Sequence, residues 1–272
     1  MPGITELWNL LIMEPMLNLL MLLYSLLFNN FVLAIVGLTV VVRLLTFPLT
    51  QKQIRSMKAM QDLQPEIQKL QKKLGKDREK LSAATMELYK EHGVNPMMGC
   101  VPMLIQMPIW IGLYQSIYQA LGSTPEQYIA LSQRLYHTIP FMHEIATRSI
   151  PLNSQFLWLH LGRPDPYYIL PVLVVAVFWL QQKLTAQPAV DPSQSQMNQT
   201  MQLMMPIMFG FITLQVSSGL AVYWVASGVL QIVQQGFTTG WGSIARVLPS
   251  GIPGLPRGEE TKKDAKRKGK KR

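Results

Sequence analysis

Residues 31–60 have the sequence FVLAIVGLTVVVRLLTFPLTQKQIRSMKAM, and this stretch decides the fold. Residues 31–50 contain one charged residue, Arg43, and match the roughly 20 apolar residues with which a helix crosses the hydrocarbon core of a bilayer. Lys52, Arg55 and Lys58 follow directly. A basic segment after an apolar helix indicates a transmembrane span that ends on the cytoplasmic side.

Further apolar stretches follow the first. We expect additional spans at 97–121, 167–186, 201–217 and 219–236. The composition agrees with this interpretation, because 49% of the 272 residues are hydrophobic, only 15% are charged and the mean hydropathy is +0.16. The sequence therefore predicts an all-α, polytopic membrane protein with a core of five transmembrane helices.

The basic residues predict the orientation of these spans. The formal net charge is +10, and ten Lys or Arg lie in 51–94 and ten more in 246–272. The positive-inside rule places both segments in the cytoplasm, together with the short loop 187–200, and the loop 122–166 outside. We thus expect a multi-pass protein of the plasma or inner membrane, with its N-terminal side outside and its C-terminal tail in the cytoplasm.

Residues 1–30 contain a shorter apolar run, from Met16 to Phe28, which Glu14 and Pro15 precede. Pro and an acidic residue are typical of the first turn of a helix. The run is short for a span. We therefore expect a helix that lies in the membrane–water interface on the outer surface and ends at Asn29 and Asn30. An extra transmembrane helix is the alternative.

The segment 51–94 has the pattern of a cytoplasmic helical hairpin. Apolar residues recur at intervals of three and four on an otherwise charged helix, at Met60, Leu63, Ile67, Leu70 and Leu74. Gly75, Lys76 and Asp77 then predict a turn, and a second amphipathic helix ends near Gly93. Pro65 interrupts the first arm and should kink or restart it.

Arg43 is the sharpest indication of function. A charge inside a span costs about 2.5–3.5 kcal/mol even on the lenient insertion scale, so the side chain should face protein or water. Thr39, Thr46 and Thr50 share its helix face by their spacing. An arginine that extends to the inner interface is the alternative.

The last span has a matching polar face, formed by Tyr223, Ser227, Gln231 and Gln234, and Gln106 adds a polar group in the second span. Such residues would be unsatisfied in lipid. We interpret the set as the wall of a water-accessible groove centred on Arg43. Ordinary hydrogen bonds between helices are the alternative for each residue.

Two other features each have two interpretations. Met201, Met204, Met205 and Met208 form a stripe that could accept varied apolar partners, although packing in the core is the interpretation we prefer. The tail from 246 to 272 is disordered by composition, and its end, KKDAKRKGKKR, could bind ribosomal RNA or anionic lipid. It could equally serve only to set the topology.

No pattern indicates catalysis or a bound metal. The histidines at 92, 137, 143 and 160 lack metal-ligand spacing, and Cys100 is the only cysteine. The outer loop 122–166 mixes Pro, Ser, Tyr and His without a clear period. We therefore expect neither an enzyme nor a cofactor.

The chain resembles the YidC/Oxa/Alb family of membrane protein insertases from about Met13 to Gln235. The matching stretches, in the family's order, are VVRLLTFPLTQKQIRSMKAMQDLQPEI (41–67), NPMMGCVPMLIQMPIWIGLYQSI (95–117), DPYYILPVL (165–173), MMPIMFGF (204–211) and GLAVYW (219–224). Two positions depart from the family pattern, because Ser218 precedes Gly219 where the family often has Pro, and Gly228 follows Ser227 where Asn is common.

The resemblance implies a five-helix core with a hydrophilic groove that is open to the cytoplasm and the bilayer but closed to the outside. It implies that Arg43 lies in this groove, which receives the polar segment of a nascent membrane protein, and that the hairpin 51–93 helps to receive substrate. The hydrophobic helix of the substrate would leave beside spans three and five. The resemblance is compatible with a protein that acts alone and with one that acts together with the Sec translocon.

Two other classes of function are alternatives to an insertase. A small-solute transporter or channel is the main alternative, but five spans do not divide into two equal inverted repeats. A purely structural assembly subunit would leave the cost of burying Arg43 unexplained.

Overall fold

A computed structural model describes residues 2–75, 77–95, 101–121, 125–135, 152–185 and 192–240. In these ranges the regular secondary structure is helical apart from two two-residue strands, so the predicted all-α fold class is confirmed. The chain divides into two compact units. Unit 1 is Met1–Thr46, Val101–Val175 and Ile207–Ser227, and unit 2 is Phe47–Cys100, Ala176–Pro206 and Gly228–Arg272.

The long helix α3 (Phe31–Asp62) begins at a cap that the sequence supplies. The Asn30 Oδ1 atom accepts hydrogen bonds from the Val32 and Leu33 N–H groups at 3.0 and 3.2 Å, which satisfies two donors of the first turn. The helix continues past residue 50 and includes Pro48. Helix bounds do not fix the edge of a bilayer, so the span 31–50 stays a prediction.

The N-terminal helix is longer than we expected. Helices α1 (Pro2–Trp8) and α2 (Glu14–Leu26) are joined without a break by the π-helix η1 (Asn9–Met13). The α-helix expected from Glu14 is present as α2, with Pro15 in its first turn, but helical residues that we did not expect precede it from Pro2. In the wider π turn the Glu14 N–H donates to the Asn9 carbonyl. Pro15 follows this turn. A proline ring in the interior of a regular helix would clash with the preceding turn of the backbone.

By length and composition, Thr5–Leu26 and Phe31–Asp62 are the helical stretches within the described ranges that could each cross a membrane. The argument that the first helix is too short to span is thus wrong. Its position in the membrane–water interface on the outer surface stays a prediction.

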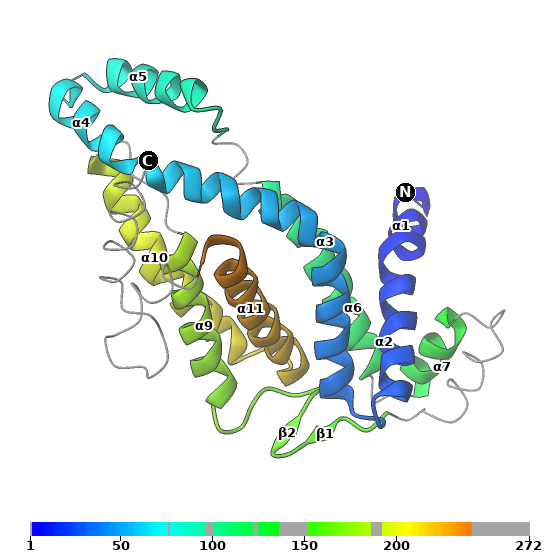
Figure 1. Cartoon of the computed structure of the whole chain (residues 1–272). Helices are drawn as coiled ribbons and strands as arrows, with labels where there is room; N and C mark the ends of the chain where they lie inside the picture. Colours follow the sequence, from blue (N-terminus) through cyan, green and yellow to red (C-terminus); the bar gives the residue numbers. More distant parts are fainter. Residues whose placement is uncertain are drawn as a thin grey trace, which may run out of the picture. The chain divides into compact units, whose positions relative to one another are not determined.

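In unit 1, the loop of residues 161–168 anchors the beginnings of two later helices (Figure 1). Within the predicted loop 122–166, which we expected to be irregular, the structure has helix α7 (Pro125–Arg134) and the antiparallel strands β1 (Gln155–Phe156) and β2 (Leu159–His160). These elements are too short to give a clear period in the sequence.

The residues after β2 cap helices α9 (Ile169–Thr185) and α11 (Ser218–Thr239). The buried Asp165 carboxylate accepts from the Leu170 N–H at 2.7 Å and the Tyr167 N–H at 3.1 Å. The Ser218 N–H and hydroxyl each donate to the Arg163 carbonyl at 2.7 Å, and the Gly219 N–H donates to the Leu161 carbonyl at 2.9 Å. The loop thereby satisfies backbone donors that a helix start leaves unpaired.

Close helix packing in unit 1 depends on glycines. Helix α6 (Val101–Ala120) contacts Ile12 and Met16 through Gly112, and Gly210 of α10 (Pro192–Thr213) contacts Val175 of α9. Glycines of this kind let helices approach closely within membranes. Helix α10 begins at Pro192, so the described part of the predicted loop 187–200 is helical rather than irregular, with Pro at the favoured first position.

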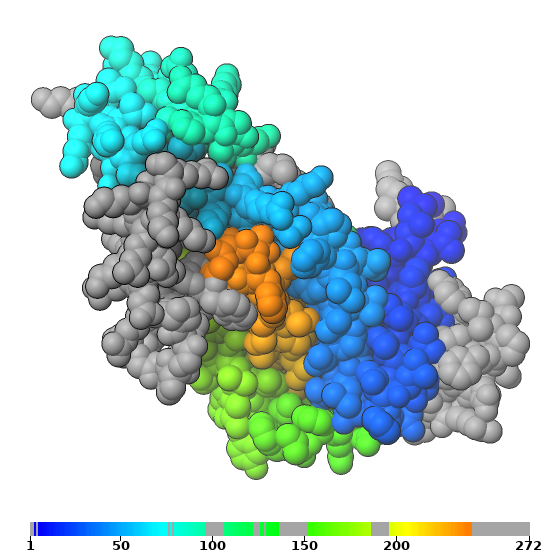
Figure 2. Space-filling view, in the orientation of Figure 1, coloured from blue at the N-terminus to red at the C-terminus, as the bar shows by residue number. Residues whose placement is uncertain are grey.

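Unit 2 contains the hairpin, whose arms are α4 (Gln64–Leu74) and α5 (Arg78–Glu91). As Pro65 predicts, α3 ends at Asp62 and α4 restarts with this proline in its first turn. The two arms form one continuous cyan surface in Figure 2. A cluster of buried side chains joins them to the end of α3, and its members are Met57, Met60, Leu63, Ile67 and Tyr89.

The turn of the hairpin is fixed by Asp77, which caps α5. Its Oδ1 atom accepts from the Lys80 N–H at 3.2 Å, and its Oδ2 atom pairs with the Lys80 ammonium at 3.0 Å. The hydrogen bond from the Lys80 side chain, followed by that from its backbone, lowers the pKa of Asp77. At the other side of the hairpin, burial raises the pKa of the Tyr89 phenol.

Candidate functional site

The structure ties Arg43 of α3 to Ser227 of α11 within unit 1. The Arg43 Nη2 atom donates to the Ser227 Oγ atom at 2.8 Å and to the Ser227 carbonyl oxygen at 2.9 Å. Arg43 is half-buried and Ser227 is buried. The guanidinium therefore meets the interior of the protein rather than lipid, as the cost of a charge in hydrocarbon requires.

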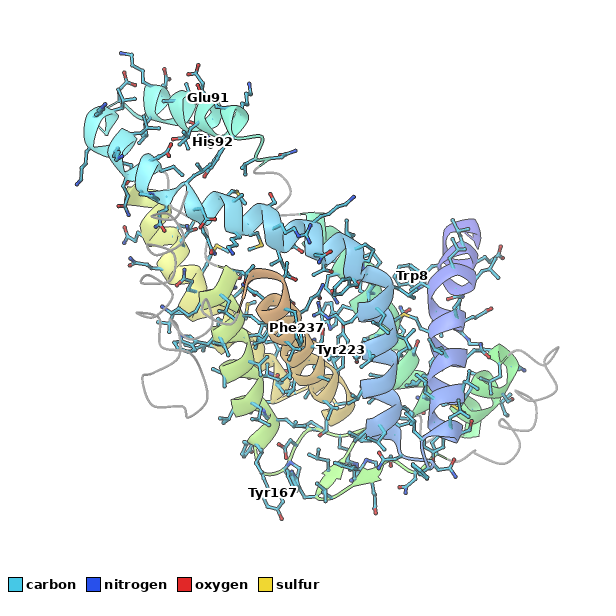
Figure 3. The ribbon with its side chains drawn as sticks, in the orientation of Figure 1. Trp8, Glu91, His92, Tyr167, Tyr223 and Phe237 are labelled. Atoms are coloured by element: carbon cyan, nitrogen blue, oxygen red, sulfur yellow. The ribbon has the colours of Figure 1, made fainter. Side chains whose placement is uncertain are left out.

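A second polar link lies one helical turn earlier on α11. The Gln106 amide of α6 donates to the Tyr223 hydroxyl at 2.8 Å. Tyr223 of α11 (Figure 3) is only 3% exposed. Gln106 is exposed. Tyr223 and Ser227 lie four residues apart, so one face of α11 carries the polar links to both α3 and α6.

Two of the three threonines of the predicted face on α3 bond within their own helix. The Thr39 hydroxyl donates to the Ile35 carbonyl at 2.6 Å, and the Thr46 hydroxyl donates to the Val42 carbonyl at 2.9 Å. Thr39 is buried, and Thr46 is half-buried. These bonds let a polar residue sit in an apolar helix at little cost, so neither threonine needs a groove to explain it.

Gln231, the remaining residue of the predicted groove, lies in unit 2. Its Oε1 atom accepts from the Gln181 amide at 3.4 Å, and the same amide donates to the Gly228 carbonyl at 3.2 Å. The structure thus joins Gln231 to α9. Gln234, on the same predicted face, donates to the Phe47 carbonyl at 3.5 Å.

Each unit also contains contacts between residues that the sequence patterns did not single out. In unit 1, Trp224 stacks on Trp110 with ring centroids 6.1 Å apart and meets Phe209 edge to face at 5.3 Å. In unit 2, the Gln61 and Gln235 amides both donate to the Leu184 carbonyl, at 3.2 and 3.0 Å. Glutamines at the end of an otherwise apolar helix were the signal that could have identified the second group.

The methionine stripe of α10 is exposed, not packed in the core. Met201, Met204 and Met208 are 46, 60 and 48% exposed. Met205 is half-buried, and its sulfur accepts from the Gln182 amide at 3.0 Å. The preference for a core position is wrong, because a helix that faces lipid can expose apolar side chains without the cost that water imposes.

Several predicted features lie outside the residues that the structure describes, namely Cys100, His137, His143 and the tail from 246 to 272. Of the predicted hairpin residues, Met60, Leu63 and Ile67 are buried, Leu70 is half-buried and Pro65 is exposed. Within the described ranges, no three His, Cys, Asp or Glu side chains are grouped so as to hold a metal ion.

The apolar helices and their internal arginine define a class of polytopic membrane protein, and the comparisons with known proteins agree. A family model described as 60Kd inner membrane protein matches residues 22–242. The membrane protein insertase YidC of Oleidesulfovibrio alaskensis is 38% identical over 229 residues, which cover 84% of this chain and 38% of that protein. The chain thus spans under two-fifths of that relative's length.

A shorter relative and a solved structure match as well. The membrane protein insertase YidC of Fusobacterium nucleatum is 36% identical over 209 residues, which cover 77% of this chain and 86% of that protein. A crystal structure described as "Active YidC insertase crystal structure with the first transmembrane domain resolved" has a TM-score of 0.53 and 28% identity, with 78% of this chain and 42% of that chain covered. The chain belongs to the YidC family of inner membrane proteins.

Proposed function

We propose that this chain is a membrane protein insertase and chaperone. In this proposal a hydrophilic groove that contains Arg43 receives the polar segment of a nascent membrane protein, and the hydrophobic helix of that substrate is released into the bilayer. The observation that carries the proposal is the polar face of α11 in unit 1, where Ser227 binds Arg43 and Tyr223 binds Gln106. The relatives named as insertases support it.

The physical reason is the cost of moving a polar segment through hydrocarbon. A charged residue at the bilayer centre costs about 2.5–3.5 kcal/mol on the insertion scale, and the hydrocarbon core is about 30 Å thick. A hydrated groove inside the membrane shortens the apolar path that the outer tail of a substrate must cross. Insertion by this route needs no covalent chemistry and no cofactor.

The sign of the charge favours one kind of substrate. Segments 31–61, 101–120 and 207–240 contain no Asp or Glu, so α3, α6 and α11 bring no carboxylate of their own to this region. A positive charge in surroundings of low dielectric attracts acidic groups more strongly than it would in water. Substrates with acidic or few charged residues in the outer tail should therefore insert best.

The remaining parts of the chain have roles that fit this proposal. The five-span topology puts the hairpin 51–94 in the cytoplasm, where it would meet the incoming chain before the groove does. The basic tail would hold ribosomal RNA or the anionic membrane surface by charge. Nascent membrane proteins and lipids are the partners that the mechanism requires, and the Sec translocon is a further candidate.

The proposal predicts insertion by the purified protein alone. In vesicles that contain this protein, a short single-span protein made by cell-free translation should acquire a protease-protected outer tail, at several times the amount found in protein-free vesicles. Vesicles with an unrelated polytopic protein at the same protein-to-lipid ratio are the control. Equal protection in all three vesicle types would contradict the insertase proposal and favour a transporter or channel.

A further inference from the structure

The guanidinium of Arg43 is held at two points by one residue on a different helix. The Arg43 Nη2 atom donates both to the Ser227 hydroxyl oxygen at 2.8 Å and to the Ser227 carbonyl oxygen at 2.9 Å. We propose that Ser227 is the positioning residue for Arg43, which fixes where the positive charge lies for an incoming acidic segment. This inference rests on the proposed insertase function and names a residue that acts through the arginine.

An arginine needs such a partner to present its charge at one place. Its side chain is long and has large rotational freedom, which a pair of hydrogen bonds to one nitrogen removes. Bonds to a charged group are also stronger than those between neutral groups, and more so where the dielectric is low. The Ser227 hydroxyl and carbonyl together therefore select one position of the guanidinium.

The hydroxyl of Ser227 is not needed to hold α11 in place. The helix start is capped by the Arg163 and Leu161 carbonyls, which bind Ser218 and Gly219. One turn before Ser227, Tyr223 bonds Gln106. Beside it, Trp224 packs on Trp110 and Phe209. Removal of the Ser227 hydroxyl should leave these contacts in place, so its effect should appear at Arg43 and at the Tyr223 hydroxyl, to which the Ser227 side chain is also hydrogen-bonded.

The chain offers a matched control in Ser116 of α6. Like Ser227 it is a buried serine within unit 1, with 0% exposure against 8%. Its hydroxyl donates to the Gly112 carbonyl of its own helix at 2.7 Å. Loss of this hydroxyl removes a buried hydrogen bond in the same unit without a change at Arg43.

The test compares Ser227→Ala, Ser227→Thr and Ser116→Ala in proteoliposomes. Two single-span substrates are used, which differ only in two tail residues, both Asp in one and both Asn in the other. The measured quantity is the ratio of inserted acidic substrate to inserted neutral substrate. We expect Ser227→Ala to lower this ratio by roughly three- to tenfold, since a hydrogen bond from a charged donor is lost, and Ser227→Thr to restore it.

Two further variants complete a double-mutant cycle. They are Arg43→Ala and the double variant that combines Arg43→Ala with Ser227→Ala. If Ser227 acts through Arg43, the second substitution should not change the ratio further once the arginine is gone. Ser116→Ala should keep the wild-type ratio, even if it lowers both yields equally.

The outcomes separate this inference from the proposed function. If Arg43→Ala lowers the ratio but Ser227→Ala does not, Ser227 is not a positioning residue and the proposed site stands. The inference is also overturned if Ser227→Ala lowers both yields equally, or if Ser227→Thr fails to restore the ratio. If Arg43→Ala itself leaves the ratio unchanged, the electrostatic site is wrong and the inference fails with it.

Discussion

Substitution of Arg43 by alanine should reduce insertion of a substrate with an acidic outer tail by at least about tenfold. Hydrogen bonds to charged groups contribute about 1.5–3 kcal/mol, and each 1.4 kcal/mol is about a factor of ten. Arg43→Lys should keep part of the activity, because it keeps the charge but loses the planar set of donors that reaches both oxygens of Ser227. Quantitative protease protection in proteoliposomes measures the loss.

Arg55→Ala is the matched control for this prediction. Arg55 lies on the same helix, but it is exposed and follows the predicted span. Its loss should leave the preference for acidic tails unchanged. Equal sensitivity to the two substitutions would mean that total basic charge matters rather than the position of Arg43. Equal insertion of strongly basic and acidic tails by the wild-type protein would contradict the electrostatic part of the mechanism.

Replacement of Gly210 by alanine should destabilise unit 1 by about 1–3 kcal/mol, the usual effect of overpacking. A Cβ atom at this position would overlap the Cγ2 atom of Val175, a short branched side chain with little room to move. Helices α9 and α10 would have to separate. Thermal unfolding of the purified protein in detergent, followed by size-exclusion chromatography, measures the change.

Gly3→Ala provides the comparison, because nothing lies within 4 Å of the position that its Cβ would take. Alanine is the better helix former, so this substitution should leave the unfolding temperature unchanged or raise it slightly. An unchanged unfolding temperature for Gly210→Ala would show that the close approach of α9 and α10 is not required for the fold.

Hydropathy and charge patterning predicted the helices of this protein well, because a bilayer imposes a simple rule on the chain. The apolar run from Phe31 is visible without any tertiary information, whereas Asn30, which we expected to end the preceding helix, caps α3. The π turn that carries the first helix through to Pro15 was not predictable, since it depends on backbone hydrogen bonds such as that from Glu14 to the Asn9 carbonyl, which no side-chain pattern marks. Helix α7 and strands β1 and β2 were too short to produce a period.

The candidate site was predictable only in part. The spacing of Tyr223 and Ser227 predicts a shared face on α11, and the cost of a buried charge predicts that Arg43 avoids lipid. Neither argument selects Ser227 as its partner, since the pairing of residues 184 positions apart depends on how the helices pack. The hydrogen bond between Gln231 and Gln181 of α9 likewise depends on helix packing and is not visible in the sequence.

The environment of a side chain also needed the structure. Buried and exposed methionines give the same periodic pattern in a membrane helix, because both lipid and protein core are apolar. Only the exposures of Met201, Met204 and Met208 distinguish the two. By contrast, the buried cluster of the hairpin, with Met60 and Ile67, is surrounded by charged residues in the sequence, and its period was therefore informative.

Site-specific photocrosslinking during translation of a short single-span protein tests the central claim most directly. Probes at Thr46 and Gln106 lie on the two helices whose polar residues surround the proposed groove, and a probe at Gln133, exposed on α7, is the control. We predict crosslinks to the nascent chain from both groove probes only while insertion is under way, and none from Gln133. If the folded protein gave no nascent-chain crosslink from either groove probe, this result would contradict the insertase account and favour a transporter or channel.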